Sequence, residues 1–239
     1  MALNGLRVVV VGGTSGIGLE VARQAAAHGA RVVAAGRSAE RVQAAQVALG
    51  EAVSVRALDM ADEADVQRFF AAGEPIDHLV VTATGGPLRF GKVVDTPVAD
   101  IRSALDNRFW GTYNVVRYAA PLIQPTGSLT LFSGGAAVKV RPGGGVLSAS
   151  VAAVEALARA LALELAPIRV NVLRSGMVDT PLLRNAYPNF DEFAKTAGAG
   201  LPVKRIGTPG DLADAVLFLM TNPYVAGTVL GVDGGGLLP

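Results

Sequence analysis

Residues 11–18 read Val-Gly-Gly-Thr-Ser-Gly-Ile-Gly and stand between an apolar run, residues 7–11, and a segment with helical spacing, residues 17–28. The apolar run has the β-branched composition of a buried strand, so the stretch is a turn from a first strand into a first helix. Gly12, Gly16 and Gly18 permit a tight turn and close approach of the backbone to a pyrophosphate, and the helix amino terminus presents free N–H groups. The stretch therefore predicts a dinucleotide site, with a plain strand-to-helix turn as the alternative.

Short β-branched runs and longer segments rich in alanine and leucine alternate along the rest of the chain. The predicted strands cover residues 7–11, 31–35, 53–58, 77–82, 128–132, 168–173 and 227–232. The predicted helices cover residues 17–28, 39–49, a stretch from about 62, 100–122, 148–166 and 211–220. This alternation predicts an α/β fold with a doubly wound, Rossmann-type parallel sheet of about seven strands and helices on both faces. No repeat or linker interrupts it, so residues 1–239 are predicted to form a single domain.

The composition narrows the classes of partner. The 21 basic and 20 acidic residues give a net charge of +1, which offers no electrostatic reason to expect nucleic acid or an anionic membrane surface. Cysteine is absent, and His28 and His78 are the only histidines, so we expect no metal site, disulfide or cysteine nucleophile. No leader pattern precedes the first strand, and no apolar run approaches the ~20 residues of a membrane span. A cytoplasmic protein with no membrane partner is the expectation.

Several motifs, in the correct order, resemble the short-chain dehydrogenase/reductase family. The glycine spacing Gly-x-x-x-Gly-x-Gly of residues 12–18 is similar to the family's first turn, although Val11 stands where the family usually has threonine. Residues 168–171 (IRVN), residues 227–235 (GTVLGVDGG) and the pair Asp59-Met60 also resemble family motifs. The resemblance covers nearly the whole chain and implies an oxidoreductase with a nicotinamide dinucleotide cofactor.

The end of the second predicted strand predicts which cofactor binds. Residues 34–38 read Ala-Ala-Gly-Arg-Ser and lack the carboxylate that would bind a ribose 2′-hydroxyl and repel a 2′-phosphate. Arg37 can pair with a phosphate and Ser38 can add a hydroxyl donor. The family's NADP-dependent members look like this, so NADP(H) is the predicted cofactor. The alternative is that Arg37 is a solvated surface side chain.

The resemblance extends to the nicotinamide end. Residues 175–180 resemble the family's PG-x-x-x-Thr segment, whose backbone and threonine hydroxyl hold the carboxamide, and residues 81–85 stand for its NNAG loop. The predicted cofactor-binding residues are Gly12, Thr14, Ser15, Gly16, Ile17, Gly18, Arg37, Ser38, Asp59, Met60, Thr82, Ala83, Thr84, Gly176, Val178 and Thr180.

The residues that the family uses for catalysis are replaced. By resemblance of the helix around residues 148–155, Leu147 stands at the tyrosine place and Val151 at the lysine place. Gly134 falls at the serine place and Arg108 at the asparagine place. Tyr-x-x-x-Lys occurs nowhere in the sequence, so the usual proton-transfer apparatus is absent under any alignment.

Two residues are the catalytic candidates that remain. Arg108 could stabilise an oxyanion, or could form a structural ion pair on its helix. Ser133 could orient a substrate oxygen, or could be a hydrogen-bonded turn residue. Further polar residues expected near the cleft, none a convincing general acid, are Lys139, Arg141, Ser148 and Arg174.

Three functions remain open. The first is an atypical NADP(H)-dependent oxidoreductase that acts on a carbonyl, alcohol or imine of a small apolar substrate without the tyrosine–lysine relay. The second is a cofactor-binding pseudoenzyme or sensor, and the third is a non-redox enzyme such as a cyclase, isomerase or dehydratase. Residues 182–201, with Tyr187, Phe190 and Phe193, look like the family's substrate lid. The long helices predict a homodimer or homotetramer, or alternatively a doubly packed monomeric core.

Overall fold

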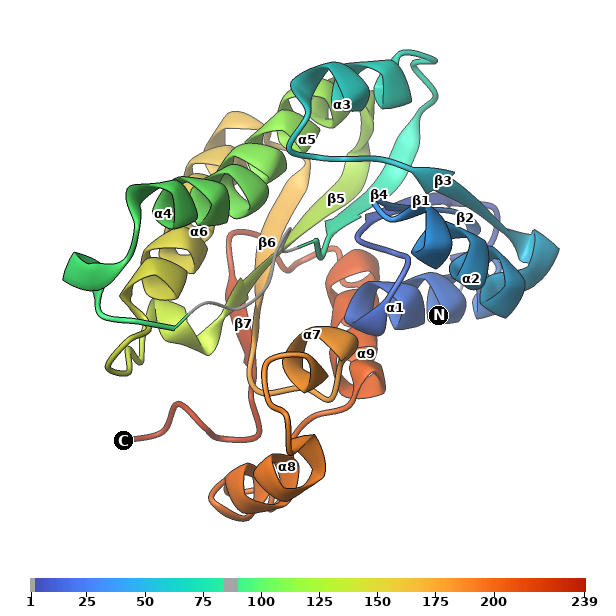
Figure 1. Ribbon diagram of the computed structural model, residues 1–239. Helices are drawn as coiled ribbons and strands as arrows, with labels where there is room; N and C mark the ends of the chain where they lie inside the picture. Colours follow the sequence, from blue (N-terminus) through green and yellow to red (C-terminus); the bar gives the residue numbers. More distant parts are fainter. Residues whose placement is uncertain (1–2, 84–89) are drawn as a thin grey trace.

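A computed structural model describes residues 3–83 and 90–239. Its strands form one parallel sheet of seven strands in the order β3-β2-β1-β4-β5-β6-β7 (Figure 1). The strands are β1 (Arg7–Val11), β2 (Arg31–Gly36), β3 (Val53–Ala57), β4 (Ile76–Val81), β5 (Ile123–Gly134), β6 (Arg169–Ser175) and β7 (Val229–Val232). The predicted fold class is confirmed.

Helices cover both faces of the sheet, and each face has its own apolar core (Figure 1). One face carries α1 (Gly16–Ala27), α2 (Ala39–Leu49) and α9 (Pro209–Thr221). The other carries α3 (Glu63–Phe70), α4 (Val98–Leu105), α5 (Gly111–Ala119) and α6 (Gly145–Glu164). Because side chains alternate along a strand, Val8 and Val10 of β1 belong to the first core and Val9 and Val11 to the second.

The structure departs from the predicted elements in three places. The long helix predicted over residues 100–122 is interrupted by a π-helical turn, η3 (Asp106–Trp110), between α4 and α5. The lid forms two helices, α7 (Pro181–Arg184) and α8 (Phe190–Ala199). Strand β5 is longer than the predicted 128–132, because residues 123–127 continue it before the buried run begins.

Helix α6 corrects the expectation that no apolar run approaches the length of a membrane span. By length and composition alone, its 20 residues qualify as a candidate span. About a third of this span is buried, and Val154, Ala158 and Leu161 pack in the core beneath β5 and β6. A helix that packs on a buried parallel sheet needs a broad apolar surface, which a count of residues does not distinguish from a lipid-facing one.

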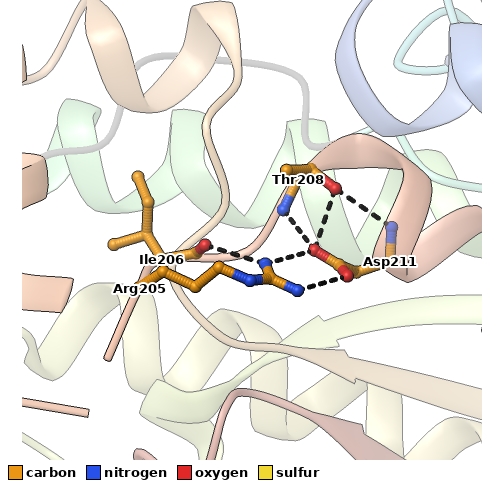
Figure 2. Close-up of polar contacts among 4 residues, drawn as sticks. All are labelled: Arg205, Ile206, Thr208 and Asp211. Atoms are coloured by element: carbon orange, nitrogen blue, oxygen red, sulfur yellow. Dashed lines mark hydrogen bonds and ion pairs between the residues drawn. The ribbon is translucent and has the colours of Figure 1, made fainter. Parts of the chain in front are cut away.

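Helix α9 begins with a capping box reinforced by an arginine (Figure 2). The Thr208 N–H donates to the Asp211 carboxylate at 2.7 Å, and the Asp211 N–H donates to Thr208 Oγ1 at 3.3 Å. Arg205 donates to both Asp211 oxygens, at 2.7 and 2.8 Å. The Arg205 guanidinium, followed by the Thr208 N–H, holds the pKa of Asp211 well below its usual range. These contacts fix the start of the helix that packs against α1.

Replacing Asp211 by alanine is expected to lower the free energy of unfolding by about 1 kcal/mol, since it removes a helix cap and an ion pair together. Because the pKa of Asp211 is lowered on folding, its contribution is present above roughly pH 4 and is lost as the pH falls further. Urea unfolding at pH 7 measures the difference. The control is Asp214→Ala, which removes an exposed carboxylate from the same helix. Equal losses in the two variants would contradict the capping role.

Candidate active site

A cavity of about 890 Å³ runs along the carboxyl ends of the parallel strands. The last residues of β1, β2, β5 and β6 line it, and so do the first residues after β4. Ligands bind at these positions in doubly wound folds. Every predicted cofactor-binding residue lines it except Thr84, which lies outside the described residues. The residues that the sequence distributes along the chain are therefore brought to one site.

The glycine turn is packed so closely that it admits no side chains. A Cβ on Gly12, whose φ is +92°, would overlap Thr82 and would lie 2.6 Å from the Ala83 nitrogen. A Cβ on Gly18 would overlap the Gly12 carbonyl. Gly16 has a φ of +54°, and a Cβ there would lie 3.3 Å from Thr180 Cγ2. Internal packing thus requires the glycines at positions 12 and 18, and the turn also lines the cavity at the amino terminus of α1, where free N–H groups suit a pyrophosphate.

Polar groups gather after β2, where the sequence predicts a phosphate contact. Arg37 is exposed on the cavity rim, and its Nη1 donates to Asn107 Oδ1 at 3.2 Å. Ser38 caps α2 by accepting the Arg41 N–H at 3.3 Å, which leaves the Ser38 hydroxyl hydrogen available for a ligand. Arg41 and Glu40 also line the cavity. The two guanidinium groups and the hydroxyl fit an anionic phosphate at this end.

The four replaced positions meet at the other part of the same cavity. Leu147 and Val151 of α6, Gly134 at the end of β5 and Arg108 of η3 all line it. A Cβ on Gly134 would lie 4.0 Å from Val151 Cγ1, so the serine and lysine places face each other as the resemblance requires. Leucine, valine and glycine offer no group that exchanges a proton. These three positions therefore offer no acid, and Tyr187 and Lys139 line the cavity from other segments.

Arg108 is a buried cation without a counter-ion in the described chain. Its side chain is 7% exposed, and its one hydrogen bond to a described residue runs from Nη1 to Ser150 Oγ at 2.8 Å. The Ser150 hydroxyl donates its own hydrogen bond to the Leu147 carbonyl at 2.8 Å. Burial lowers the pKa of Arg108 to about 10, so the group stays charged at neutral pH. The cavity thus holds a guanidinium with unused donors.

Ser133 is bound to a buried carboxylate. Its Oγ donates to Glu155 Oε1 at 2.6 Å, and Arg174 donates to both oxygens of Glu155, at 2.8 and 2.7 Å. Burial by itself would raise the pKa of Glu155, but the hydrogen bonds from Arg174 and Ser133 outweigh it and hold the pKa below its usual value. Ser133 therefore presents only lone pairs to the cavity. It can accept a hydrogen bond from a hydroxyl or a protonated imine.

The remaining polar candidates separate into two groups. Lys139 and Arg141 line the cavity, and Lys139 donates to the carbonyls of Gly236 and Leu238 at 3.1 and 3.0 Å. Ser148 is not among the lining residues, and Arg174 is held in the ion pair with Glu155. Among the described residues, no group of three or more metal-binding side chains exists.

The lid contributes an apolar wall. Tyr187 lines the cavity and stacks on Phe193 with ring centroids 3.6 Å apart. Arg184 pairs with Asp179 and lies 4.3 Å above the Phe190 ring, which fixes α7 relative to α8. Thr180 caps α7 by accepting the Leu183 N–H at 3.3 Å. The aromatic lid residues hold one another, and Tyr187 alone of the three reaches the cavity.

Sequence reasoning missed several lining residues. Asn107 directly precedes Arg108, and Arg41 lies four residues after Arg37. Their closeness in sequence to predicted site residues was the only signal that could have identified them. Phe90 and Leu237 also line the cavity, although they belong to no motif and are distant in sequence from the predicted site residues. Only the folded chain brings these two to the substrate end.

The chain is similar to known proteins in sequence and in fold. A family model described as enoyl-(acyl carrier protein) reductase matches residues 11–236. The short-chain dehydrogenase/reductase malC of Malbranchea aurantiaca is 32% identical and aligns with 99% of this chain and 96% of its own length. The chain belongs to the short-chain dehydrogenase/reductase family. Within this family it is also 35% identical to the 3-oxoacyl-(acyl-carrier-protein) reductase of Bos taurus, over 95% of both chains.

Two solved members of the short-chain dehydrogenase/reductase family superpose closely. One is a small-chain dehydrogenase in complex with NADPH, with a TM-score of 0.85, 35% identity and coverage of 99% of this chain and 100% of the other. The other is the MalC reductase/Diels-Alderase from Malbranchea aurantiaca, with a TM-score of 0.91 and 29% identity over 99% and 98% of the two chains. The family assignment made from the motifs is confirmed.

Replacing Arg108 by methionine is expected to raise the free energy of unfolding by roughly 1–3 kcal/mol, because an unpaired buried cation gives way to an apolar side chain of similar length. Chemical denaturation of the two proteins without ligand measures the change. Arg174→Met is the opposite control, since it strands the Glu155 carboxylate and should destabilise. A less stable Arg108→Met protein would show that Arg108 is a structural group.

Proposed function

We propose that this chain is an NADP(H)-dependent oxidoreductase that acts on a carbonyl, alcohol or imine of a small apolar substrate, with Arg108 in place of the tyrosine–lysine pair. The observation that carries the proposal is the buried guanidinium of Arg108, without a counter-ion among the described residues, in a cleft lined by the predicted cofactor-binding residues other than Thr84. Retaining an unpaired buried cation costs stability, which is the mark of a group kept for a ligand.

The cofactor is held by this chain's own groups along the strand ends. The backbone from Gly12 to Gly18 receives the pyrophosphate, Arg37 and Ser38 the 2′-phosphate, and Val178 and Thr180 the carboxamide. The loop residues Thr82 and Ala83 and the pair Asp59-Met60 complete the set. When bound, NADPH supplies a hydride.

Arg108 is proposed to meet the reacting atom of the substrate. As a carbonyl carbon accepts hydride, negative charge develops on its oxygen, and a guanidinium placed beside that oxygen stabilises the charge. Leu147 cannot supply the proton, so water or a group of the substrate does. Ser133 accepts a hydrogen bond from a substrate hydroxyl or N–H, because its own hydrogen is committed to Glu155. The apolar wall from Tyr187 and Phe90 supports a small apolar substrate.

A non-redox cyclisation is a second candidate function. It is favoured by the likeness to the MalC reductase/Diels-Alderase, whose name joins a reduction with a cycloaddition. A cycloaddition needs no proton donor, and it uses a shaped apolar cavity with a polarising donor, which Arg108 provides. A pseudoenzyme that only binds cofactor remains the outcome if neither turnover is found.

The exposed apolar side chains of the helices support a homodimer or homotetramer. Trp110 of η3 is 51% exposed and Leu163 of α6 is 83% exposed. Both lie on the segments predicted to pair across subunits. We propose a homo-oligomeric, cytoplasmic enzyme with a small-molecule substrate and with no nucleic-acid, membrane or metal partner.

Fluorescence titration of the protein with NADPH and with NADH tests the cofactor. The unmodified protein should prefer NADPH, and Arg37→Ala should weaken NADPH roughly 10- to 100-fold because a charge-assisted pair with the phosphate is lost. NADH binding should change little. Arg23→Ala, which removes an exposed arginine of α1, is the matched control. Equal affinity of the unmodified protein for both cofactors would overturn the NADP(H) assignment.

Turnover of carbonyl and imine compounds by Arg108 variants tests the catalytic role. Arg108→Gln should lower kcat by ~10²- to 10³-fold and leave NADPH binding unchanged, whereas Arg108→Lys should retain part of the activity. Burial lowers the pKa of Arg108 to about 10. The charge of Arg108 should therefore not change activity near neutral pH, and activity should fall as the pH rises past 10. Substrate loss without NADPH oxidation would favour cyclisation, and unchanged kcat in Arg108→Gln would remove Arg108 from the mechanism.

A further inference from the structure

The π-helical turn η3 carries two consecutive side chains that face different groups of the cleft. Asn107 contacts Arg37 after β2, and Arg108 contacts Ser150 on α6. A π turn inserts an extra residue into the helix and so changes the direction of the side chains that follow it. The turn thus brings the predicted 2′-phosphate contact and the buried cation onto one short segment.

The orientation of the Asn107 amide is fixed by its own helix. Its Nδ2 donates to the Ser103 carbonyl at 2.7 Å and to Ser103 Oγ at 3.3 Å. Because the Ser103 carbonyl can only accept, the amide nitrogen lies on that side and Oδ1 points the other way, where it accepts from Arg37 Nη1 at 3.2 Å. Asn107 is therefore a preset acceptor beside an exposed arginine.

We propose that Asn107 is a specificity-determining positioning residue, which holds the Arg37 guanidinium in place for the 2′-phosphate of NADP(H). The inference rests on the proposed cofactor. A free arginine loses rotamer freedom when it binds a phosphate, and a hydrogen bond made beforehand removes part of that loss. Arg41, by contrast, has no side-chain hydrogen bond or ion pair to a described residue. Its charge reaches the same rim without being oriented.

The neutral amide is suited to this task. One hydrogen of Arg37 is used by Asn107, and the remaining donors of the guanidinium stay free for a bidentate pair with a phosphate. A carboxylate at position 107 would also hold Arg37, but it would neutralise the guanidinium and repel the phosphate. Asparagine orients Arg37 while it leaves the full positive charge available.

The test is a double-mutant cycle read out by cofactor binding. NADPH and NADH are titrated against the unmodified protein, Asn107→Ala, Arg37→Ala and the double variant. Asn107→Ala should weaken NADPH about threefold to tenfold, the effect of one hydrogen bond, and should leave NADH within about twofold. In the Arg37→Ala background it should cause no further loss of NADPH, because there is no guanidinium left to orient. Asn189→Ala, an exposed asparagine before α8, is the matched control.

Asn107→Asp is the second variant and should weaken NADPH more than Asn107→Ala does, again without an equal effect on NADH. The positioning role would be overturned if Asn107→Ala lowered the affinity for NADPH and NADH equally, or if it lowered the NADPH affinity as much in the Arg37→Ala background as in the unmodified protein. If the unmodified protein prefers NADPH and both Asn107 variants bind NADPH with unchanged affinity, only the inference about Asn107 is overturned. An unmodified protein without a preference for NADPH overturns the proposed cofactor as well.

Discussion

The reversal of strand order between β1 and β4 is the constraint on which the rest of the structure depends. From β1 the chain runs outward to β2 and β3, then returns to β4 on the other side and continues to β7. The loops after β1 and β4 therefore diverge to opposite faces, and a crevice opens between them at the carboxyl edge. The packing of Gly12 against Thr82 and Ala83 closes the floor of this crevice. Any ligand long enough to follow the edge meets the ends of β1, β2, β5 and β6 and the residues that follow β3, β4 and β7.

The two buried charges near Ser133 and Leu147 are compensated to different degrees. Glu155 is buried, but Arg174 neutralises it and Ser133 completes its hydrogen bonds, so the cluster is satisfied internally. Arg108 is buried to a similar degree, and its one hydrogen-bond partner in residues 3–83 and 90–239 is the hydroxyl of Ser150. A satisfied cluster rigidifies the scaffold, whereas an unsatisfied cation attracts an electron-rich ligand. The contrast supports a structural role for the Glu155–Arg174 pair and the functional role proposed for Arg108.

The predicted replacement of the tyrosine and lysine would change what the cleft can do. Two apolar side chains on α6, Leu147 and Val151, form part of the cavity wall, and Arg108 of η3 lines the same cavity. A guanidinium with a pKa near 10 donates hydrogen bonds well and releases a proton poorly. Such a group suits reactions in which charge must be stabilised and the proton comes from elsewhere, or in which no proton moves.

The sequence by itself determined the fold, the family and the dinucleotide turn, because each depends on local patterns: β-branched runs, glycines at fixed spacing and the IRVN and VDGG motifs. The four replacements stay a prediction that rests on the resemblance of the helix around residues 148–155 to the family's helix. The sequence did not predict the break in the helix at η3, because a π turn has no sequence pattern of its own. Nor did it show which polar groups are paired. Whether Ser133 and Arg174 are free or bound to Glu155, and whether Arg108 has a counter-ion, depends on contacts between residues 19 to 42 positions apart. Only the tertiary structure decides these partners, because burial and pairing are properties of neighbours in space and not of neighbours in the chain.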